Sequence, residues 1–175
     1  SRIGKPVDVI WGHRFMGRFD SDQEALLVPQ LYDNVLGKDD FKYEDKNQAG
    51  VVDDNDMSMI GNSSPRLYYA LNARFTYKNV ELYVLGTGYA FYDILLNNNY
   101  YWNGWGDDNY SRYVLENQGG ENFPKLSYYK VNNNFVSSDF WLTKGGFFKI
   151  QNAELAWNIP ASEKLKWSGA RNLRL

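Results

Sequence analysis

The stretch from Phe147 to Pro160 reads Phe-Phe-Lys-Ile-Gln-Asn-Ala-Glu-Leu-Ala-Trp-Asn-Ile-Pro. Ala153, Leu155, Trp157 and Ile159 alternate with Asn152, Glu154, Ala156 and Asn158. Side chains alternate across a strand, so this order gives one apolar and one mostly polar face. Pro160 ends the segment because it cannot donate a ladder hydrogen bond. Two environments fit such a strand: a half-buried antiparallel sheet of a soluble protein, or a membrane barrel with lipid outside and water inside.

A second alternating stretch runs from Leu67 to Tyr77, close to the length of about 9–11 residues that a tilted strand needs to cross a bilayer. The pair Lys78-Asn79 then predicts a tight turn, after which Val80 resumes the apolar face. Residues 67–92 are therefore expected to form a hairpin of two long strands. Gly86 and Gly88 indicate a bulge or close packing in its second strand.

The alternation assigns side chains of these strands to two faces. In a barrel, one set is expected to point away from the interior: Leu71, Phe75, Leu82, Leu155, Trp157 and Ile159. The other set is expected to point into it: Asn72, Arg74, Glu81, Asn152 and Glu154.

The composition narrows the class of protein. Aromatic residues make up 17% of the 175 residues although the mean hydropathy is −0.57, and no apolar run reaches the roughly 20 residues of a membrane helix. The absence of cysteine excludes disulfides and thiolate metal sites. A net charge of −2 lacks the basic excess that is typical of nucleic-acid-binding proteins. Many aromatic residues in a polar chain suit strands with wet loops, interfacial girdles or sugar-stacking surfaces.

The connections differ greatly in length. Residues 1–66 are expected to form an extended arm and an acidic loop, with a short helix capped by Ser21 and Glu24. Residues 93–139 show no periodicity and predict a long loop, residues 140–160 one or more strands, and residues 161–175 a turn and the start of another strand. Short turns on one side and long loops on the other are typical of outer-membrane barrels, in which the long loops are extracellular.

Six motifs occur in order along nearly the whole chain: Ile3 to Val7 followed by Trp11-Gly12, Lys42 to Asn47, Ile60 to Pro65, Asn122 to Leu126, Ser138 to Leu142, and Gly146 to Asn152 with Asn158-Ile159-Pro160. Together they resemble the C-terminal barrel region of the SusC/RagA family of TonB-dependent outer-membrane transporters. The resemblance implies an all-β fold that is part of an antiparallel transmembrane β-barrel, with long extracellular loops and short periplasmic turns.

The resemblance also implies a function. Members of this family import oligosaccharides or peptides across the outer membrane with energy from TonB, and a SusD-like surface lipoprotein acts as a lid. TonB acts through a plug region that this chain lacks, so we expect a fragment of a longer protein. The alternative is a soluble secreted β-rich glycan-binding module. Sandwich strands average about 5–6 residues, and the long alternating stretches favour the transporter.

The acidic loop resembles a twelve-residue calcium loop, with Gly50 at its sharp turn. Its candidate ligands are Asp45, Asn47, the carbonyl group of Val51, Asp53 and Asp56. Ala49 supplies no oxygen at the fifth position, and Asp56 is shorter than the usual bidentate Glu. The alternative is a surface loop held by Asx turns without an ion.

Aromatic residues of the long loop are candidates for contact with a sugar or with the lid lipoprotein: Tyr100, Tyr101, Trp102, Trp105, Tyr110 and Tyr113. Packing within the loop is the alternative reading of this cluster. No serine lies in a nucleophile motif, no carboxylate pair has catalytic spacing, and His13 is the one histidine. The sequence therefore gives no support to an enzyme.

Overall fold

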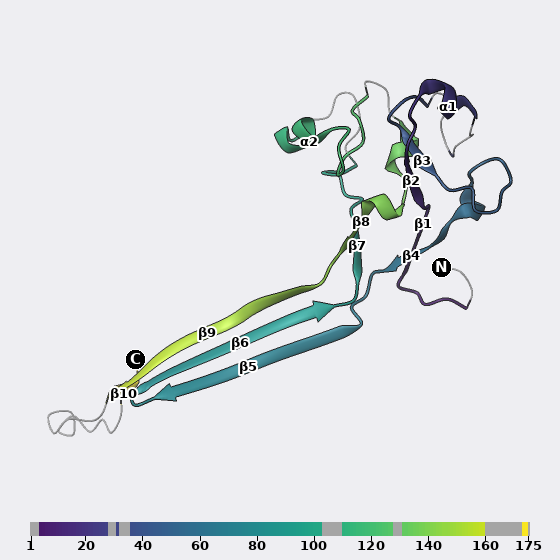
Figure 1. Cartoon of the computed structure of the whole chain (residues 1–175). Coiled ribbons are helices and arrows are strands. Elements are labelled where there is room, and N and C mark those ends of the chain that lie inside the picture. Colours follow the sequence, from purple (N-terminus) through teal and green to yellow (C-terminus); the bar gives the residue numbers. More distant parts are fainter. Residues whose placement is uncertain are drawn as a thin grey trace. The chain divides into compact units, whose positions relative to one another are not determined.

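The computed structural model in Figure 1 describes residues 4–27, 31, 36–102, 110–127, 131–159 and 173–174. The chain divides into two compact units. Unit 1 comprises Ser1–Ser64 and Tyr92–Lys144, and unit 2 comprises Pro65–Phe91 and Gly145–Leu175. Most of the regular structure is strand, arranged in small antiparallel sheets. Among the described residues, no helix is both long and apolar enough to cross a membrane.

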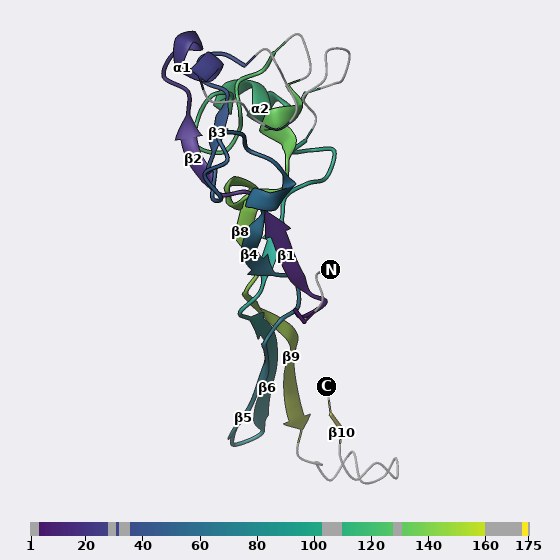
Figure 2. The ribbon, with the colours of Figure 1, turned by 90° about the vertical axis from the view of Figure 1, so that its right-hand side faces the viewer.

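Unit 2 is a four-stranded antiparallel sheet with the order β10-β9-β6-β5. Its strands are β5 (Leu67–Tyr77), β6 (Val80–Ala90), β9 (Phe147–Ile159) and β10 (Leu173–Arg174). The three long strands lie side by side in Figure 2. Tyr77 pairs with Val80 across the turn at Lys78-Asn79, and Lys78 adopts a left-handed φ of 52°. The predicted hairpin and its two-residue turn are confirmed.

A β-bulge divides the pairing of β6 with β9. Leu85 pairs with Asn152 but its neighbour Gly86 pairs with Ile150, so Gln151 is the extra residue. The bulge shifts the alternation of β9 by one position. As a result, Phe148 and Ile150 lie on the same face as Leu155, whereas an unbroken register would place Lys149 and Gln151 there.

The two faces of this sheet are defined by the register, because paired residues point to the same side. The apolar face carries Tyr69, Leu71, Ala73, Phe75, Tyr77, Val80, Leu82, Val84, Gly86, Gly88, Phe148, Ile150, Ala153, Leu155 and Trp157. The polar face carries Tyr68, Ala70, Asn72, Arg74, Thr76, Glu81, Tyr83, Leu85, Thr87, Tyr89, Phe147, Lys149, Asn152, Glu154, Ala156 and Asn158.

Aromatic rings cover the two glycines of β6. A Cβ atom on Gly86 would lie 2.2 Å from the Phe148 ring, and one on Gly88 would lie 2.4 Å from Tyr69. The Tyr69 and Phe148 rings are stacked, with centroids 5.9 Å apart and an interplanar angle of 5°. The glycines thus mark close packing, one of the two alternatives that their positions in the sequence indicated, and the extra residue of the bulge lies in the neighbouring strand β9.

Unit 1 contains three short strand pairs. β1 (Val9–Gly12) pairs with β4 (Ser58–Asn62), β2 (Phe15–Arg18) with β3 (Phe41–Tyr43), and β7 (Asp93–Leu95) with β8 (Leu142–Lys144). Its main core consists of four buried residues, Phe41, Tyr43, Val52 and Trp141. A smaller cluster joins Phe19, Ala25 and Leu36.

The expected short helix is α1 (Asp22–Leu27). The Glu24 N–H donates to Ser21 Oγ at 3.2 Å, as predicted for an N-cap. The Glu24 carboxylate accepts from the N–H of Asp20 at 2.9 Å, one residue earlier than in the usual capping box.

The segment 93–139 contains more regular structure than the long loop predicted from its lack of periodicity. It contains β7, the helix α2 (Arg112–Asn117), the 3-10 helix η2 (Asn132–Phe135) and the first residue of η3 (Asp139–Trp141). Unit 1 also includes η1 (Asp54–Asp56) in the acidic loop. The reason for the difference is packing between distant segments: buried Asn133 and Asn134 bind β3, and Trp141 joins the core. Residues 160–172 lie outside the described residues, as does most of the turn predicted there.

Candidate functional site

The apolar face of unit 2 is a broad exposed surface. Leu71, Phe75 and Leu155 are 65%, 64% and 72% exposed. Soluble proteins rarely expose large contiguous apolar patches unless these contact a membrane or a partner. The face is therefore the strongest candidate for a functional surface in the described part of the chain.

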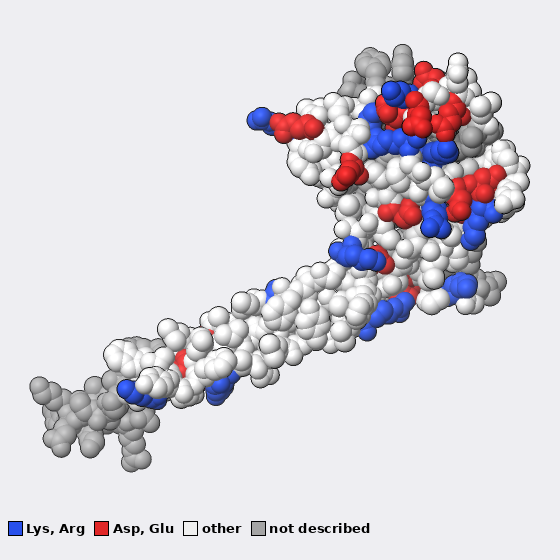
Figure 3. All heavy atoms as spheres, viewed as in Figure 1, with Lys and Arg blue, Asp and Glu red and all other residues white. Residues whose placement is uncertain are grey.

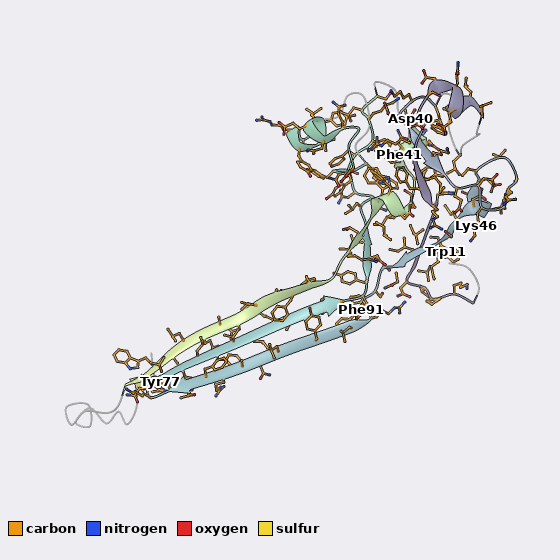
Figure 4. The ribbon with its side chains drawn as sticks, viewed as in Figure 1. Trp11, Asp40, Phe41, Lys46, Tyr77 and Phe91 are labelled. Atoms are coloured by element: carbon orange, nitrogen blue, oxygen red, sulfur yellow. The ribbon has the colours of Figure 1, made fainter. Side chains whose placement is uncertain are left out.

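Aromatic rings lie at both ends of the apolar face. Tyr77 and Trp157 lie at the turn end, where both flank Val80, and Tyr77 is labelled in Figure 4. Tyr69 and Phe148 lie toward the opposite end. Between these ends the side chains are aliphatic apart from Phe75 and Gly86. An apolar band flanked by aromatic girdles is the pattern of strands whose outer face meets lipid.

The polar face carries hydrogen-bonded and charged pairs. Arg74 Nη1 lies 3.6 Å from Glu81 Oε1, and its guanidinium lies 5.5 Å from the centre of the Tyr83 ring. Asn152 Nδ2 donates to Glu154 Oε1 at 2.8 Å. Paired polar groups of this kind suit a surface that faces water.

The predicted grouping of side chains on this sheet is confirmed by the register. Leu71, Phe75, Leu82, Leu155 and Trp157 share the apolar face, and Asn72, Arg74, Glu81, Asn152 and Glu154 share the polar face. The side chain of Ile159 lies outside the described residues. Figure 3 shows many charged side chains on unit 1 and few on the visible surface of the sheet of unit 2.

The acidic loop is closed by hydrogen bonds to its carboxylates. Asp45 accepts from the N–H groups of Ala49 at 3.1 Å and Gly50 at 2.7 Å. Buried Asp56 accepts from the N–H groups of Lys46 and Asn47 through one oxygen and of Asp53 through the other. Burial alone would raise the pKa of Asp56, but these three donors and nearby His13 outweigh it and lower that pKa.

The acidic candidate ligands for calcium do not form a metal-binding group among the described residues. No group of three or more acidic, histidine or cysteine side chains suited to a metal occurs in the described part of the chain, so Asp45, Asp53 and Asp56 form none. Val51 is exposed, and Asp53 caps η1 by accepting from the Asn55 N–H at 2.7 Å. The loop geometry is that of Asx turns and a capping box. Calcium binding stays a prediction.

Calcium titration tests the acidic loop directly. If calcium binds the folded loop, added calcium should raise the melting temperature by mass action, and Asp45→Ala should abolish that rise. The measurement is thermal unfolding of the protein with calcium or with a chelator. If calcium changes the melting temperature of neither the unsubstituted protein nor Asp45→Ala, the loop does not bind calcium. The alternative, a surface loop held by Asx turns without an ion, would then be correct.

The described members of the aromatic cluster belong to unit 1 and pack mainly within it. Tyr101 stacks on Phe123 with centroids 5.9 Å apart, and Trp102 lies 6.2 Å from Trp141. Tyr113 meets Phe123 edge-on at 5.8 Å. Tyr100 and Tyr113 remain about half exposed, whereas Tyr110 is partly buried. Trp105 lies outside the described residues. This packing leaves Tyr100 and Tyr113 as the best-placed described members for contact with a partner.

His13 is a buried group that the sequence did not distinguish from a surface histidine. It follows β1, is 1% exposed, and its ring centre lies 5.7 Å from that of Tyr43. Burial lowers the pKa of His13, and the carboxylates of Asp54, Asp56 and Asp53 oppose this shift only in part. The imidazole is therefore held neutral near pH 7.

Protonation of His13 should destabilise unit 1 in mild acid. Because the folded pKa lies below the ordinary value of 6.5, stability is full above that pH. It should then fall as the pH drops below 6.5 toward the folded pKa. Hydrogen exchange of the Phe41 amide, followed as a function of pH, measures the stability of unit 1. His13→Gln should remove the dependence of stability on pH just below pH 6.5. The lowered carboxyl pKa of Asp56 affects stability only near and below its ordinary value of 3.8. An unchanged slope in His13→Gln would contradict this assignment.

Among known proteins, the chain is similar to a TonB-dependent receptor, and no family model matches it. The chain is 25% identical over 180 aligned residues to TonB-dependent receptor P26 of Formosa agariphila. The alignment covers 97% of this chain and 17% of that receptor. The chain is distantly homologous to a TonB-dependent receptor. This relationship indicates a segment of an outer-membrane transporter and favours transport over catalysis.

In an outer-membrane receptor, the two faces of a strand meet lipid and water, so the face on which each residue lies matters. The bulge at Gln151, which changes these faces, was not predicted from the sequence. The bulge at Gln151 brings Phe148 and Ile150 onto the apolar face and Lys149 onto the polar face. Its signal was partly present: Phe148 and Ile150 occupy even positions before residue 151, whereas Ala153, Leu155 and Trp157 occupy odd positions after it. Such a change of phase within a strand is what an inserted residue produces.

Proposed function

We propose that this chain is part of the barrel wall of a SusC/RagA-type active importer in the outer membrane. The observation that carries the proposal is the continuous, exposed apolar face of a sheet whose β5 and β6 each have 11 residues and whose β9 has 13. Strands of about 9–11 residues cross a bilayer when tilted. In the proposed arrangement the apolar face meets lipid and the polar face lines the barrel interior.

The connections define the proposed orientation. The tight turn at Lys78-Asn79 and the segment after β9 lie in the periplasm, and the long segments 1–66 and 93–139 lie outside the cell. The different sizes of these connections support this orientation, since outer-membrane barrels have short periplasmic turns and long extracellular loops. Unit 1, which contains the long segments, is then an extracellular structure.

The cargo and partners proposed here are those of the family. The complete importer takes up oligosaccharides or peptides, receives energy from TonB through a plug region outside this chain, and works with a SusD-like lipoprotein as lid. The exposed rings of Tyr100 and Tyr113 are the proposed contacts for that lipoprotein, since aromatic side chains are enriched at interfaces.

A soluble glycan-binding module fits less well. Such a module would bury one face of each sheet against a second layer. The described residues of unit 2 form a single sheet with Leu71 and Leu155 more than half exposed, and its long strands are about twice the usual length of about 5–6 residues.

Single-cysteine labelling tests the proposed function, and these 175 residues contribute no competing cysteine. Leu71→Cys and Asn72→Cys place a thiol on opposite faces of β5 at nearly the same height. In the full-length protein within membranes, a lipid-soluble maleimide should label position 71 and a water-soluble maleimide should label position 72.

The control pair is Leu155→Cys and Glu154→Cys on β9, which should behave in the same way. The opposite reactivity, with position 71 open to the water-soluble reagent and position 72 sealed, would reverse the faces. Equal labelling of all four positions by the water-soluble reagent would refute the membrane location.

A further inference from the structure

The polar face of unit 2 contains a hollow with an aromatic wall. Its volume is about 330 Å³, it opens to solvent, and it is lined by Tyr68, Tyr69, Ala70, Thr87, Tyr89, Lys149 and Gln151. Tyr69 lies in β5 between Tyr68 and Ala70, and the register places its side chain on the opposite face. A volume near the lower end of the range of about 300–1,000 Å³ for ligand sites suits a single small ring. All of these residues belong to unit 2.

The register explains why a hollow forms there. Tyr68 pairs with Tyr89, and Tyr89 pairs with Phe147, so three rings form a row across the sheet. The rings meet edge to face, at 4.9 Å between the two tyrosines and 5.2 Å between Tyr89 and Phe147. The next row contains the small side chains of Ala70 and Thr87, which leave space beside the rings.

The bulge at Gln151 completes the hollow opposite the aromatic wall. It places Lys149 beside Thr87, and the Thr87 hydroxyl donates to Gln151 Oε1 at 3.2 Å. In the described part of the chain, no carboxylate is paired with Lys149, whereas Arg74 on the same face is neutralised by Glu81. The hollow therefore presents a cation and amide and hydroxyl groups next to an exposed tyrosine ring.

We infer that this hollow binds a sugar ring that carries a carboxylate, such as a hexuronic acid residue. The nonpolar face of the sugar ring packs against Tyr89 and Tyr68, and the carboxylate pairs with Lys149. The side chains of Thr87 and Gln151 hydrogen-bond the ring hydroxyls. The inference rests on the proposed function, because it takes the polar face to line the path of the cargo. It narrows that cargo from oligosaccharides or peptides to acidic oligosaccharides.

Matched sugars test the inference by calorimetry on the full-length protein in detergent. D-Glucuronate and D-glucose differ only at C6, which is a carboxylate in glucuronate and a hydroxymethyl group in glucose. Glucuronate should bind about fivefold more tightly, the ratio expected of an exposed charge pair. Lys149→Met should remove this preference, and Lys149→Arg should retain it. Lys78→Met, at the turn of the same sheet, is the control and should leave the ratio unchanged.

Three results would overturn the inference: equal affinity for the two sugars, a preference that survives Lys149→Met, or displacement of glucuronate by acetate or trialanine at equal concentration. The assay requires neither lipid nor transport. If sugar binding fails while the cysteine labelling succeeds, only this inference falls. If labelling refutes the membrane location while binding succeeds, the proposed function and the narrowing of its cargo fall, and the binding of an acidic sugar to the hollow stands.

Discussion

Leu155→Arg is expected to lower the free energy of unfolding of the full-length protein in a phospholipid bilayer by about 2–4 kcal/mol if the site lies near the midplane. Leu155 pairs with Leu82, which in turn pairs with Phe75, and all three lie well inside the apolar face. An arginine there would place a guanidinium group among lipid chains. Denaturant titration of protein refolded into phospholipid vesicles measures the loss.

Asn152→Arg on the same strand is the matched control. Asn152 lies on the polar face, where it hydrogen-bonds Glu154, so an added cation should meet water and a carboxylate. Its cost should be much smaller than that of Leu155→Arg. Equal losses in the two variants would show that neither face of the sheet meets lipid, and a larger loss for Asn152→Arg would reverse the two faces.

The hairpin of unit 2 could be predicted because its signal is local. The period-2 alternation from Leu67 to Tyr77 and the short connection at Lys78-Asn79 depend only on neighbours in the sequence. β5 has the predicted bounds, and β6 follows it after two residues. The sheet faces follow from the same pattern, since pairing across the turn keeps apolar residues opposite each other.

The bulge could be predicted only in part. The change of phase around Gln151 is visible in the sequence, but its position opposite Gly86 depends on how β9 pairs with β6. The two strands are separated by more than fifty residues, and local periodicity carries no information about such pairing. The hollow beside Lys149 depends on that register and was therefore out of reach.

The fold of unit 1 was the least predictable part. Its strands have three to five residues, too few for a period to be recognised. Its core joins Phe41 with Trp141, and Asn133 and Asn134 contact β3 across more than ninety residues. The same asparagine run in isolation is typical of a loop, and nothing local marks two of its members as buried.

The largest stability effect expected in unit 1 comes from Asn134. Its side chain is 1% exposed and joins two buried neighbours. Oδ1 accepts from the Phe41 N–H at 2.8 Å, and Nδ2 donates to Asp40 Oδ1 at 2.9 Å. Asn133 Nδ2 donates to the Phe41 carbonyl at 2.7 Å, so the two asparagines satisfy both backbone groups of Phe41. Phe41, labelled with Asp40 in Figure 4, can be fully buried because these groups are bonded.

Asn134→Ala should therefore cost about 2–6 kcal/mol, since it leaves the Phe41 N–H and an Asp40 oxygen buried without partners at about 1–3 kcal/mol each. The free energy of opening, from hydrogen exchange at Phe41 and Tyr43, measures the loss. Asn132→Ala in the same run is the control. Asn132 is only partly buried, and its replacement should change this free energy by less than about 0.5 kcal/mol.

Asn134→Asp separates the hydrogen bonds from the volume of the side chain. It keeps an acceptor for the Phe41 N–H but sets a second carboxylate against buried Asp40. Two carboxylates at this distance cannot both ionise without a large cost, so the variant should be strongly destabilised at neutral pH. Relative to Asn132→Ala at the same pH, acidification should then restore part of the loss by protonating the introduced carboxylate, whereas the loss in Asn134→Ala should not recover. If both variants are as stable as Asn132→Ala, the hydrogen bonds between Asn134 and its neighbours Phe41 and Asp40 do not stabilise unit 1.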